Sequence, residues 1–330
     1  MRKSIAVYVS MALIALTGAN AGASLLFYDG FDYAPPGTLL APLNDTVATP
    51  NPGLLNVAYG WNWRYAGAGG AGNQAPGIAS GGLNYTDVGA AGYSGLQSTI
   101  GNSVLFDMTQ LGSARVQVTP AAISSGTVYY SGLLQVNSIG TLTAAGAGIL
   151  LGGFTTATGP GTAPPGTVGG VLRIRTDASD PAVYHIGVGM NSGNATGAGG
   201  PNVQFDTAPH TAGQTVFVVA SYEFVAGANN DIARMWINPD PADFALASPP
   251  SATLTAAPGV AVADSSANLI SFNLRNVNTV GLPTGVLFDE LRVGTSWADV
   301  MPAAIPEPTA AGLIGLGLLV ASGWHRLRRH

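Results

Sequence analysis

Carboxylate side chains are the residues of this sequence that come closest to a catalytic set. Most glycosidases hold two carboxyl groups at a fixed separation across the bond that they cut. The chain has three glutamates, Glu223, Glu290 and Glu307, and no two of them are close neighbours on one strand. Asp289 and Glu290 are adjacent, so a regular strand would direct them to opposite faces. The sequence therefore predicts that the protein is not a glycoside hydrolase.

Nucleophilic and zinc chemistry lack their usual residues as well. The chain contains no cysteine and no G-x-S-x-G motif, which argues against thiolate sites, disulfides and the common serine nucleophile. His185 lies in an apolar segment and His210 follows a proline. Because a zinc site usually needs three or four protein ligands, we interpret both histidines as structural. We expect no enzymatic activity.

Calcium is the ion that suits this sequence best, since it takes oxygen ligands from flexible loops. Asp and Asn also make turns without any metal. We therefore expect no obligatory cofactor, with Asp29 and Asp32 as the first candidate calcium ligands. The other candidate pairs are Asp177 with Asp180 and Asn230 with Asp231.

Four aromatic residues, Trp61, Trp63, Tyr65 and Trp236, are candidates for stacking against the apolar face of a sugar. Trp61 and Trp63 would share one face of a strand. Aromatic side chains also dominate the packing of cores, and we expect core burial ahead of ligand contact. Trp61, Trp63 and Trp236 are kept as the candidate carbohydrate-contact residues.

Composition and charge argue against a nucleic-acid partner. Only 9% of the 330 residues are charged, against about 25% in an average soluble protein. Seven arginines and sixteen acidic residues lie between Ser24 and Ile305, which gives this part of the chain a formal net charge of −9. Such a charge repels a phosphate backbone.

Period-two patterns run through the body and predict strands that bury one face. In residues 171–176, Leu172 and Ile174 alternate with Arg173 and Arg175. The body has no convincing helical periodicity, and its many short strands indicate an all-β antiparallel sandwich. The expected strands are 61–65, 114–119, 128–136, 148–154, 171–176, 183–190, 215–224, 232–237, 269–274 and 286–293.

Both ends of the chain read as addresses. Arg2 and Lys3 precede an apolar run at 5–16, and the small residues Ala21 and Ala23 follow. This order is that of a secretory signal peptide. We expect residues 1–23 to form a signal helix that the Sec translocon accepts and signal peptidase removes after Ala21 or Ala23.

The C-terminus has three parts. Pro306-Glu307-Pro308 is followed by an uncharged run at 309–324 and by Arg326, Arg328 and Arg329. This pattern resembles the PEP-CTERM sorting signal of Gram-negative bacteria that make exopolysaccharide. The resemblance implies a transmembrane helix within 303–330, stopped at the inner membrane by the arginines, and cleavage near the motif by an exosortase. An ordinary C-terminal membrane anchor is the alternative.

Three segments of the body resemble concanavalin A-like and LamG-like jelly rolls. They are residues 28–32, 233–239 and 288–294. The resemblance implies one jelly-roll domain over 24–302 in which the first and last strands pair. It makes carbohydrate or matrix contact an expectation, although this fold hosts many functions.

Together these observations give a hypothesis of function. We expect a non-catalytic protein, exported to the cell envelope, outer surface or extracellular matrix of a Gram-negative bacterium after a transient inner-membrane stage. Its expected role is structural or adhesive within exopolysaccharide, so polysaccharide is a candidate partner beside the exosortase. The alternatives are a carbohydrate-binding, lectin-like module and a glycoside hydrolase, for which the glutamate pair is absent.

Overall fold

The computed structural model describes residues 25–33, 36–41, 63–67, 74–96, 98–99, 101–107, 111–144, 146–158, 165–191, 202–257, 264, 268–276 and 283–302. The expected signal helix at 1–23 and the expected transmembrane helix within 303–330 lie outside these ranges. Within them, no helix has the length and apolar character that crossing a membrane requires.

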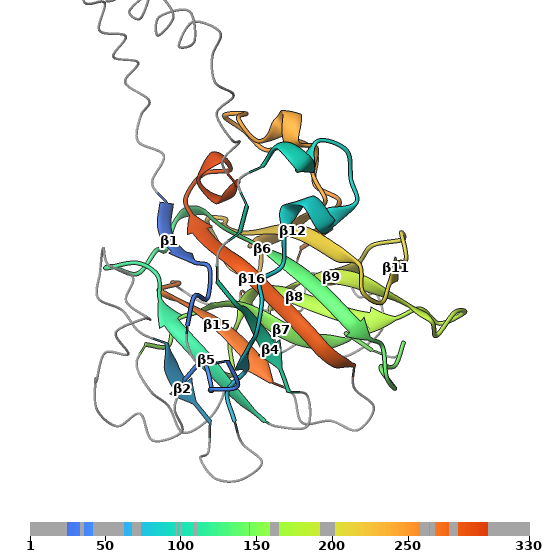
Figure 1. Cartoon of the computed structure of the whole chain (residues 1–330). Helices are drawn as coiled ribbons and strands as arrows, with labels where there is room; N and C mark the ends of the chain where they lie inside the picture. The colour runs from blue at the N-terminus through green and yellow to red at the C-terminus, as the bar shows by residue number, and fades with distance from the viewer. Residues whose placement is uncertain are drawn as a thin grey trace, which may run out of the picture.

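The described residues form two antiparallel β-sheets and four short 3-10 helices (Figure 1). The all-β antiparallel sandwich that the sequence predicts is therefore confirmed. Sheet I contains β1 (Leu25–Asp29), β3 (Gly77–Ala79), β4 (Ser103–Phe106), β6 (Gly126–Ser138), β12 (Thr215–Phe224), β13 (Ile232–Ile237), β14 (Leu254–Ala256) and β16 (Thr284–Gly294). Sheet II contains β2 (Arg64–Ala66), β5 (Gly112–Gln117), β7 (Ile149–Thr155), β8 (Gly169–Thr176), β9 (Val183–Asn191), β10 (Val203–Phe205), β11 (His210–Thr211) and β15 (Ser271–Asn276). The 3-10 helices are η1 (Tyr85–Val88), η2 (Tyr93–Gly95), η3 (Pro241–Asp243) and η4 (Ala298–Val300).

The last strand, β16, lies in the interior of sheet I. The strands of this sheet follow the order β14-β13-β12-β6-β16-β4-β3, and β1 also pairs with β16. One edge of β16 pairs with β6, and the other pairs with β4 over 286–288 and with β1 over 291–294. The expected pairing of the first and last strands is thus present, as Figure 1 shows.

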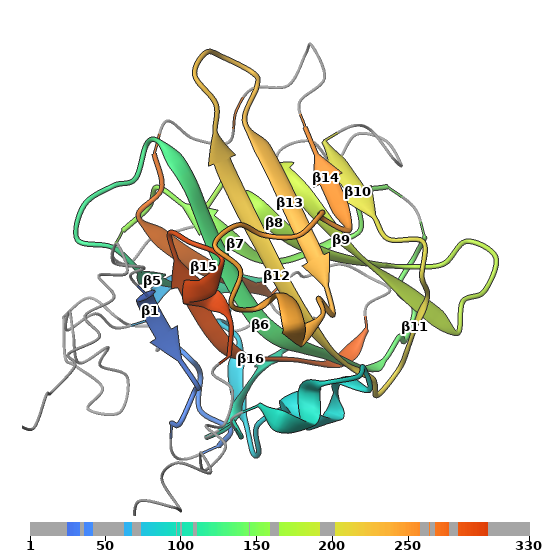
Figure 2. The ribbon, with the colours of Figure 1, turned by 90° about the horizontal axis from the view of Figure 1, so that it is seen from above.

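The main core fills the space between the two sheets. Sheet II follows the order β10-β9-β8-β7-β15-β5-β2, with β11 added beside β9. In Figure 2, β16, β6, β12 and β13 run side by side in front of β7, β8 and β9. Leu172 and Ile174 of β8 lie in this core, whereas Arg173 and Arg175 alternate with them and face outward. The alternation read from the sequence therefore sets the orientation of the strand.

A second apolar layer covers the outer face of sheet I. Phe217 of β12 packs there against Tyr85 of η1 and Tyr93 of η2, with ring centroids 5.5 and 6.1 Å away. Phe244, next to η3, lies 5.9 Å from the same ring. Figure 1 shows the 3-10 helices gathered on one side of the molecule. Sheet I is therefore apolar on both faces, and sheet II keeps a polar outer face.

A β-bulge in β16 turns two acidic side chains to the same side of sheet I. The pairing with β6 shifts between Asp289 and Arg292, and Glu290 takes a left-handed φ of 56°. Phe288 and Leu291 both lie in the core, so the bulge leaves Asp289 and Glu290 on the outer side. The expectation that these two residues face opposite ways is wrong, because it assumed a regular strand.

Both carboxylates of the bulge are buried and have partners. Asp289 Oδ2 accepts the Leu83 N–H at 2.8 Å, and Glu290 Oε1 accepts the Tyr28 hydroxyl at 3.0 Å. The Arg292 guanidinium lies 3.5 Å from Glu290 Oε2 and stacks over the Tyr28 ring. Burial raises the pKa of Asp289 to about 9, in spite of its backbone hydrogen bonds. These groups hold the sheet and its cover together.

Asp29 performs a similar task at the end of β1. Its Oδ2 accepts the Trp63 Nε1–H at 2.7 Å and the Tyr33 hydroxyl, and its Oδ1 accepts the Phe31 N–H at 2.8 Å. Burial raises the pKa of this carboxyl to about 6. The three donors fix the first strand to the turn that follows it and to Trp63.

We predict that the folded protein loses stability as the pH rises. The pKa values of Asp29 and Asp289, about 6 and about 9, both exceed the ordinary value of 3.8. The folded state therefore retains protons that the unfolded state releases, and this contribution is complete below about pH 4 and lost as the pH passes the folded-state values. Calorimetry should show Tm falling from about pH 5 to about pH 9.

The variant Asp289→Asn should reduce this fall in Tm, because the substituted side chain does not ionise. Asp32→Asn is the control, since Asp32 is an exposed neighbour of Asp29, and it should leave the slope unchanged. A Tm that climbs steadily over the same pH range would contradict the prediction.

Candidate functional site

The outer face of sheet II carries a row of polar side chains along β15. Phe272 and Leu274 of this strand belong to the main core. Ser271, Asn273 and Arg275 alternate with them and therefore face outward. A hydroxyl, an amide and a guanidinium thus follow one another along a single strand.

Strand β5 sets a second polar row beside the first. Residues paired across antiparallel strands place their side chains on the same face, about 4.5–5.5 Å apart at Cβ. The register pairs Ser271 with Gln117, Asn273 with Arg115, and Arg275 with Ser113. We call these six residues the polar ladder.

Several polar atoms of the ladder have no hydrogen-bond partner in the described part of the chain. They are the Ser271 hydroxyl oxygen, both amide atoms of Asn273, and Nε of Arg275. Ser271 and Asn273 are 0% exposed. An unsatisfied buried polar group costs about 1–3 kcal/mol, and native proteins rarely keep one that neither water, ion nor ligand satisfies. The ladder therefore has hydrogen-bonding capacity to offer to a ligand.

Arg173 of β8 extends the polar surface beyond the ladder. Its Nη1 and Nη2 donate to the carbonyls of Ala147 and Asn191 at 3.2 and 3.3 Å, and its Nε has no partner among the described residues. A Cβ at Gly189 would lie 2.9 Å from this Nε, so the glycine makes room for the guanidinium. Burial, and then the charge of Arg275, lower the pKa of Arg173 to about 10. Two unpaired cations thus repel each other across this face.

A stacked pair closes the face toward β10. The Arg175 guanidinium lies 4.2 Å from the centroid of the Phe205 ring. This ring lies over Gly187, where a Cβ would approach it to 2.6 Å. Such a cation–π contact stabilises by about 0.5–2 kcal/mol. Phe205 is therefore occupied by Arg175.

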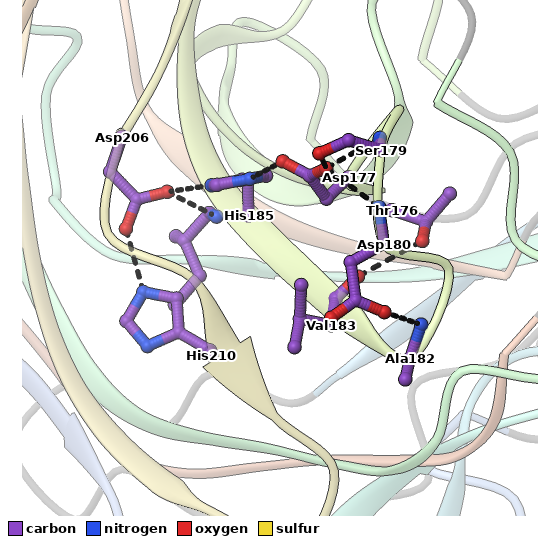
Figure 3. Close-up of polar contacts among 10 residues, drawn as sticks. Thr176, Asp177, Ser179, Asp180, Ala182, Val183, His185, Asp206 and His210 are labelled. Atoms are coloured by element: carbon purple, nitrogen blue, oxygen red, sulfur yellow. Dashed lines mark hydrogen bonds and ion pairs between the residues drawn. The ribbon is translucent and has the colours of Figure 1, made fainter.

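A chain of two histidines and two aspartates borders the same face (Figure 3). His185 of β9 lies 2.7 Å from Asp177 through Nε2 and 3.2 Å from Asp206 through Nδ1. The other oxygen of Asp206 lies 2.6 Å from His210 Nε2. Asp206 also accepts the Ile186 N–H at 3.0 Å. One buried carboxylate therefore joins β9, β11 and the segment before β11.

This chain of contacts fastens an edge of the sheet. Hydrogen bonds from Ser179, and then from His185, hold the pKa of Asp177 well below its ordinary value. No three His, Cys, Asp or Glu side chains in the described ranges are grouped so as to hold a metal ion. The interpretation of His185 and His210 as structural agrees with this geometry. Nothing in their spacing indicated that they share Asp206.

Two of the three predicted carbohydrate-contact residues are core side chains. Trp63 and Trp236 are each 2% exposed. Their indole N–H groups donate to Asp29 and to the Pro250 carbonyl, respectively. A buried ring does not stack on a sugar, so the carbohydrate-contact prediction is wrong for both, and the expected core burial is confirmed. Trp61 lies outside the described residues.

The first candidate calcium pair does not fit a shared ion. Both oxygens of Asp29 already accept hydrogen bonds in the interior, whereas Asp32 is exposed. Asp177 and Asp180 each accept backbone N–H groups of their own turn. These carboxylates therefore have local partners that explain them without a metal.

The third candidate pair, Asn230 and Asp231, lies in a turn that holds an anion. The N–H groups of Asn229, Asn230 and Asp231 all donate to the Asp264 carboxylate, at 2.8, 2.8 and 3.0 Å. Converging N–H groups attract negative charge. This turn is therefore unsuited to a cation at the same point.

Comparison with known proteins gives likenesses of backbone only. No family model and no curated protein matches the chain. Among solved structures, it is similar to domain 4 of AbnA, a GH43 extracellular arabinanase from Geobacillus stearothermophilus, in complex with arabinotriose (TM-score 0.37, 13% identity, 75% of this chain and 92% of that one). It is also similar to the carbohydrate recognition domain of Emp47p (TM-score 0.35, 9% identity, 83% and 97%). The exoplasmic/lumenal domain of VIP36 bound to Ca2+ and Man3GlcNAc gives a TM-score of 0.35 at 9% identity, over 74% and 86%. At such identities these proteins assign no ligand to this chain.

We predict that Asp206→Ala destabilises the protein by about 3 kcal/mol. The change removes the acceptor of three hydrogen bonds and leaves buried donors without partners, each of which costs about 1–3 kcal/mol. Urea unfolding measures the effect. Asp180→Ala, which removes one exposed turn contact, is the control and should unfold near the wild-type midpoint. Equal midpoints for the two variants would show that the histidine chain adds nothing to stability.

Proposed function

We propose that this protein is an exported, non-catalytic carbohydrate-binding sandwich that binds its glycan on the polar ladder of sheet II. The observation that carries the proposal is the set of partnerless polar atoms on Ser271, Asn273 and Arg275. They stand on the outer face of one sheet, whereas the outer face of the other sheet is sealed by aromatic packing.

Sugars suit the chemistry of the ladder. A hydroxyl group of a sugar both donates and accepts, and an amide such as Asn273 offers one acceptor and two donors. Guanidinium groups add further donors in a fixed plane. A row of such groups along β15 and β5 matches a linear polymer better than a small compact ligand. The resemblance of residues 28–32 and 288–294 to concanavalin A-like and LamG-like jelly rolls agrees with this choice.

The absence of catalysis is also part of the proposal. Glu290 and Asp289 are 2% and 0% exposed, and Glu223 forms an ion pair with Arg234 on sheet I. No two of these carboxylates stand on the polar ladder. Binding without cleavage is therefore the activity that the described residues support.

Sorting to the cell surface completes the proposal. The support is the sequence of Pro306-Glu307-Pro308, the uncharged run at 309–324 and the terminal arginines. An exosortase that cuts near the motif would release the body to the envelope or the matrix, where a glycan-binding face acts as an adhesive. Calcium has no role in this proposal.

We predict that the mature protein binds polysaccharides and that Asn273→Ala weakens this binding by about tenfold. The expected loss corresponds to one or two hydrogen bonds of a buried amide. Affinity electrophoresis in gels that contain a panel of polysaccharides measures it. Asn137→Ala, an exposed amide on sheet I, is the control. Failure to retard the wild-type protein in any gel would refute carbohydrate binding and favour a purely structural matrix protein.

We predict that the protein from its native host lacks both ends of the printed chain. Intact-mass measurement should show loss of the residues up to Ala21 or Ala23 and of those beyond about Pro306. A protein that retains 309–330 and sediments with the inner membrane would contradict exosortase processing. It would instead be a surface protein with an ordinary C-terminal anchor.

A further inference from the structure

Charge is divided unequally between the two sheets. The part of the chain between Ser24 and Ile305 has seven arginines and sixteen acidic residues. The strands of sheet II contain five of these arginines and no Asp or Glu. The strands of sheet I contain the other two arginines and four acidic residues. The five arginines of sheet II are Arg64 on β2, Arg115 on β5, Arg173 and Arg175 on β8, and Arg275 on β15.

All five arginines lie on the outer face of sheet II. Each directly follows a residue of the main core, as Arg275 follows Leu274 and Arg115 follows Ala114. Since neighbouring residues of a strand face opposite ways, the arginines face away from the core. An acidic protein thus concentrates its positive charge on the face that carries the polar ladder.

These cations are held where water compensates them poorly. Arg115 and Arg173 are 6% and 2% exposed. Burial lowers the pKa values of Arg115 and Arg275 as well as that of Arg173. A partly desolvated cation without an anion is costly. Negative charge brought to this face would relieve that cost.

The acidic residues nearest along the chain do not supply that charge to the ladder. Asp177 and Asp206 lie beside β9, at the opposite side of the sheet from β15 and β5. Both are bound to His185, as Figure 3 shows. Arg275 forms no ion pair with any residue in the described ranges.

We infer that the glycan bound on the polar ladder is an acidic polysaccharide, whose carboxylate groups pair with Arg275 and its neighbouring arginines. The inference rests on the proposed function and names the class of its ligand. Carboxylates match the planar fork of a guanidinium in two parallel hydrogen bonds. Hydroxyl groups of the same sugars can satisfy Ser271 and Asn273 between the charged contacts.

Acidic polysaccharide fits this face better than nucleic acid. The net charge of −9 repels a long, densely charged phosphate chain. Single-stranded nucleic acids are usually bound by aromatic side chains that stack on bases, and Phe205 on this face already stacks with Arg175. A polymer with a spaced carboxylate on each sugar asks for fewer simultaneous ion pairs.

The test compares polygalacturonate with its methyl-esterified form, which has the same backbone without the charge. Isothermal titration of the mature protein should give at least tenfold weaker binding to the ester, because charge-assisted hydrogen bonds are lost. Arg275→Gln should weaken binding to polygalacturonate by about tenfold and leave binding to the ester nearly unchanged. Arg234→Gln, an arginine of sheet I paired with Glu223, is the control and should bind as wild type.

The outcomes separate the inference from the proposed function. Equal binding to both polymers would overturn the acidic ligand and leave carbohydrate binding in place, whereas binding to neither polymer nor to any other glycan would overturn both. Equal binding to dextran sulfate or to single-stranded DNA would show attraction to any polyanion and would also overturn the inference. Since Arg275→Gln removes an unpaired cation, its Tm should not fall, so a loss of binding with unchanged Tm reports on the ligand alone.

Discussion

The interior position of β16 is the constraint on which the rest of the sandwich depends. This last strand pairs with β6 along one edge and with β4 and β1 along the other, so sheet I is incomplete until the end of the body is in place. Its bulge directs Asp289 to the Leu83 N–H and thereby fixes the start of the aromatic cover. The first strand, the core and the cover are all assembled around one strand, which explains why burial is accepted for carboxylates that would otherwise be costly there.

The two outer faces follow from this arrangement. The segments that connect the strands of sheet I return over its outer face and seal it with Tyr85, Tyr93 and Phe244 around Phe217. Sheet II receives no such apolar layer over β15 and β5, and its strands alternate core residues with Ser, Asn, Gln and Arg. Stability is thus concentrated on one side of the molecule and unsatisfied polar capacity on the other. A binding face of this kind needs a rigid sheet behind it, because the unpaired groups of the face do not stabilise the fold themselves.

Period-two alternation was sufficient to predict most of the long strands. The expected strands 215–224 and 232–237 coincide with β12 and β13. Strands β3, β10, β11 and β14 contain two or three residues, which is too short for a period to appear. The bulge was missed because Glu290, a residue that rarely adopts positive φ, takes that conformation through tertiary contacts. The tryptophans were recognised as core candidates from their size alone. The polar ladder was not recognised, although the segment at 271–276 alternates clearly, because the lack of partners for Asn273 depends on strands far away in sequence.

The interior place of β16 also has a mechanical consequence. The C-terminal tail leaves the body a few residues after this strand, so any pull on the tail reaches the middle of sheet I and not an edge. Force along β16 acts on its hydrogen bonds to β6, β4 and β1 together, and these bonds share the load in shear. A body joined to a surface or a matrix through its C-terminal end would therefore resist extraction of its last strand, while the glycan-binding sheet behind it remains undistorted under flow.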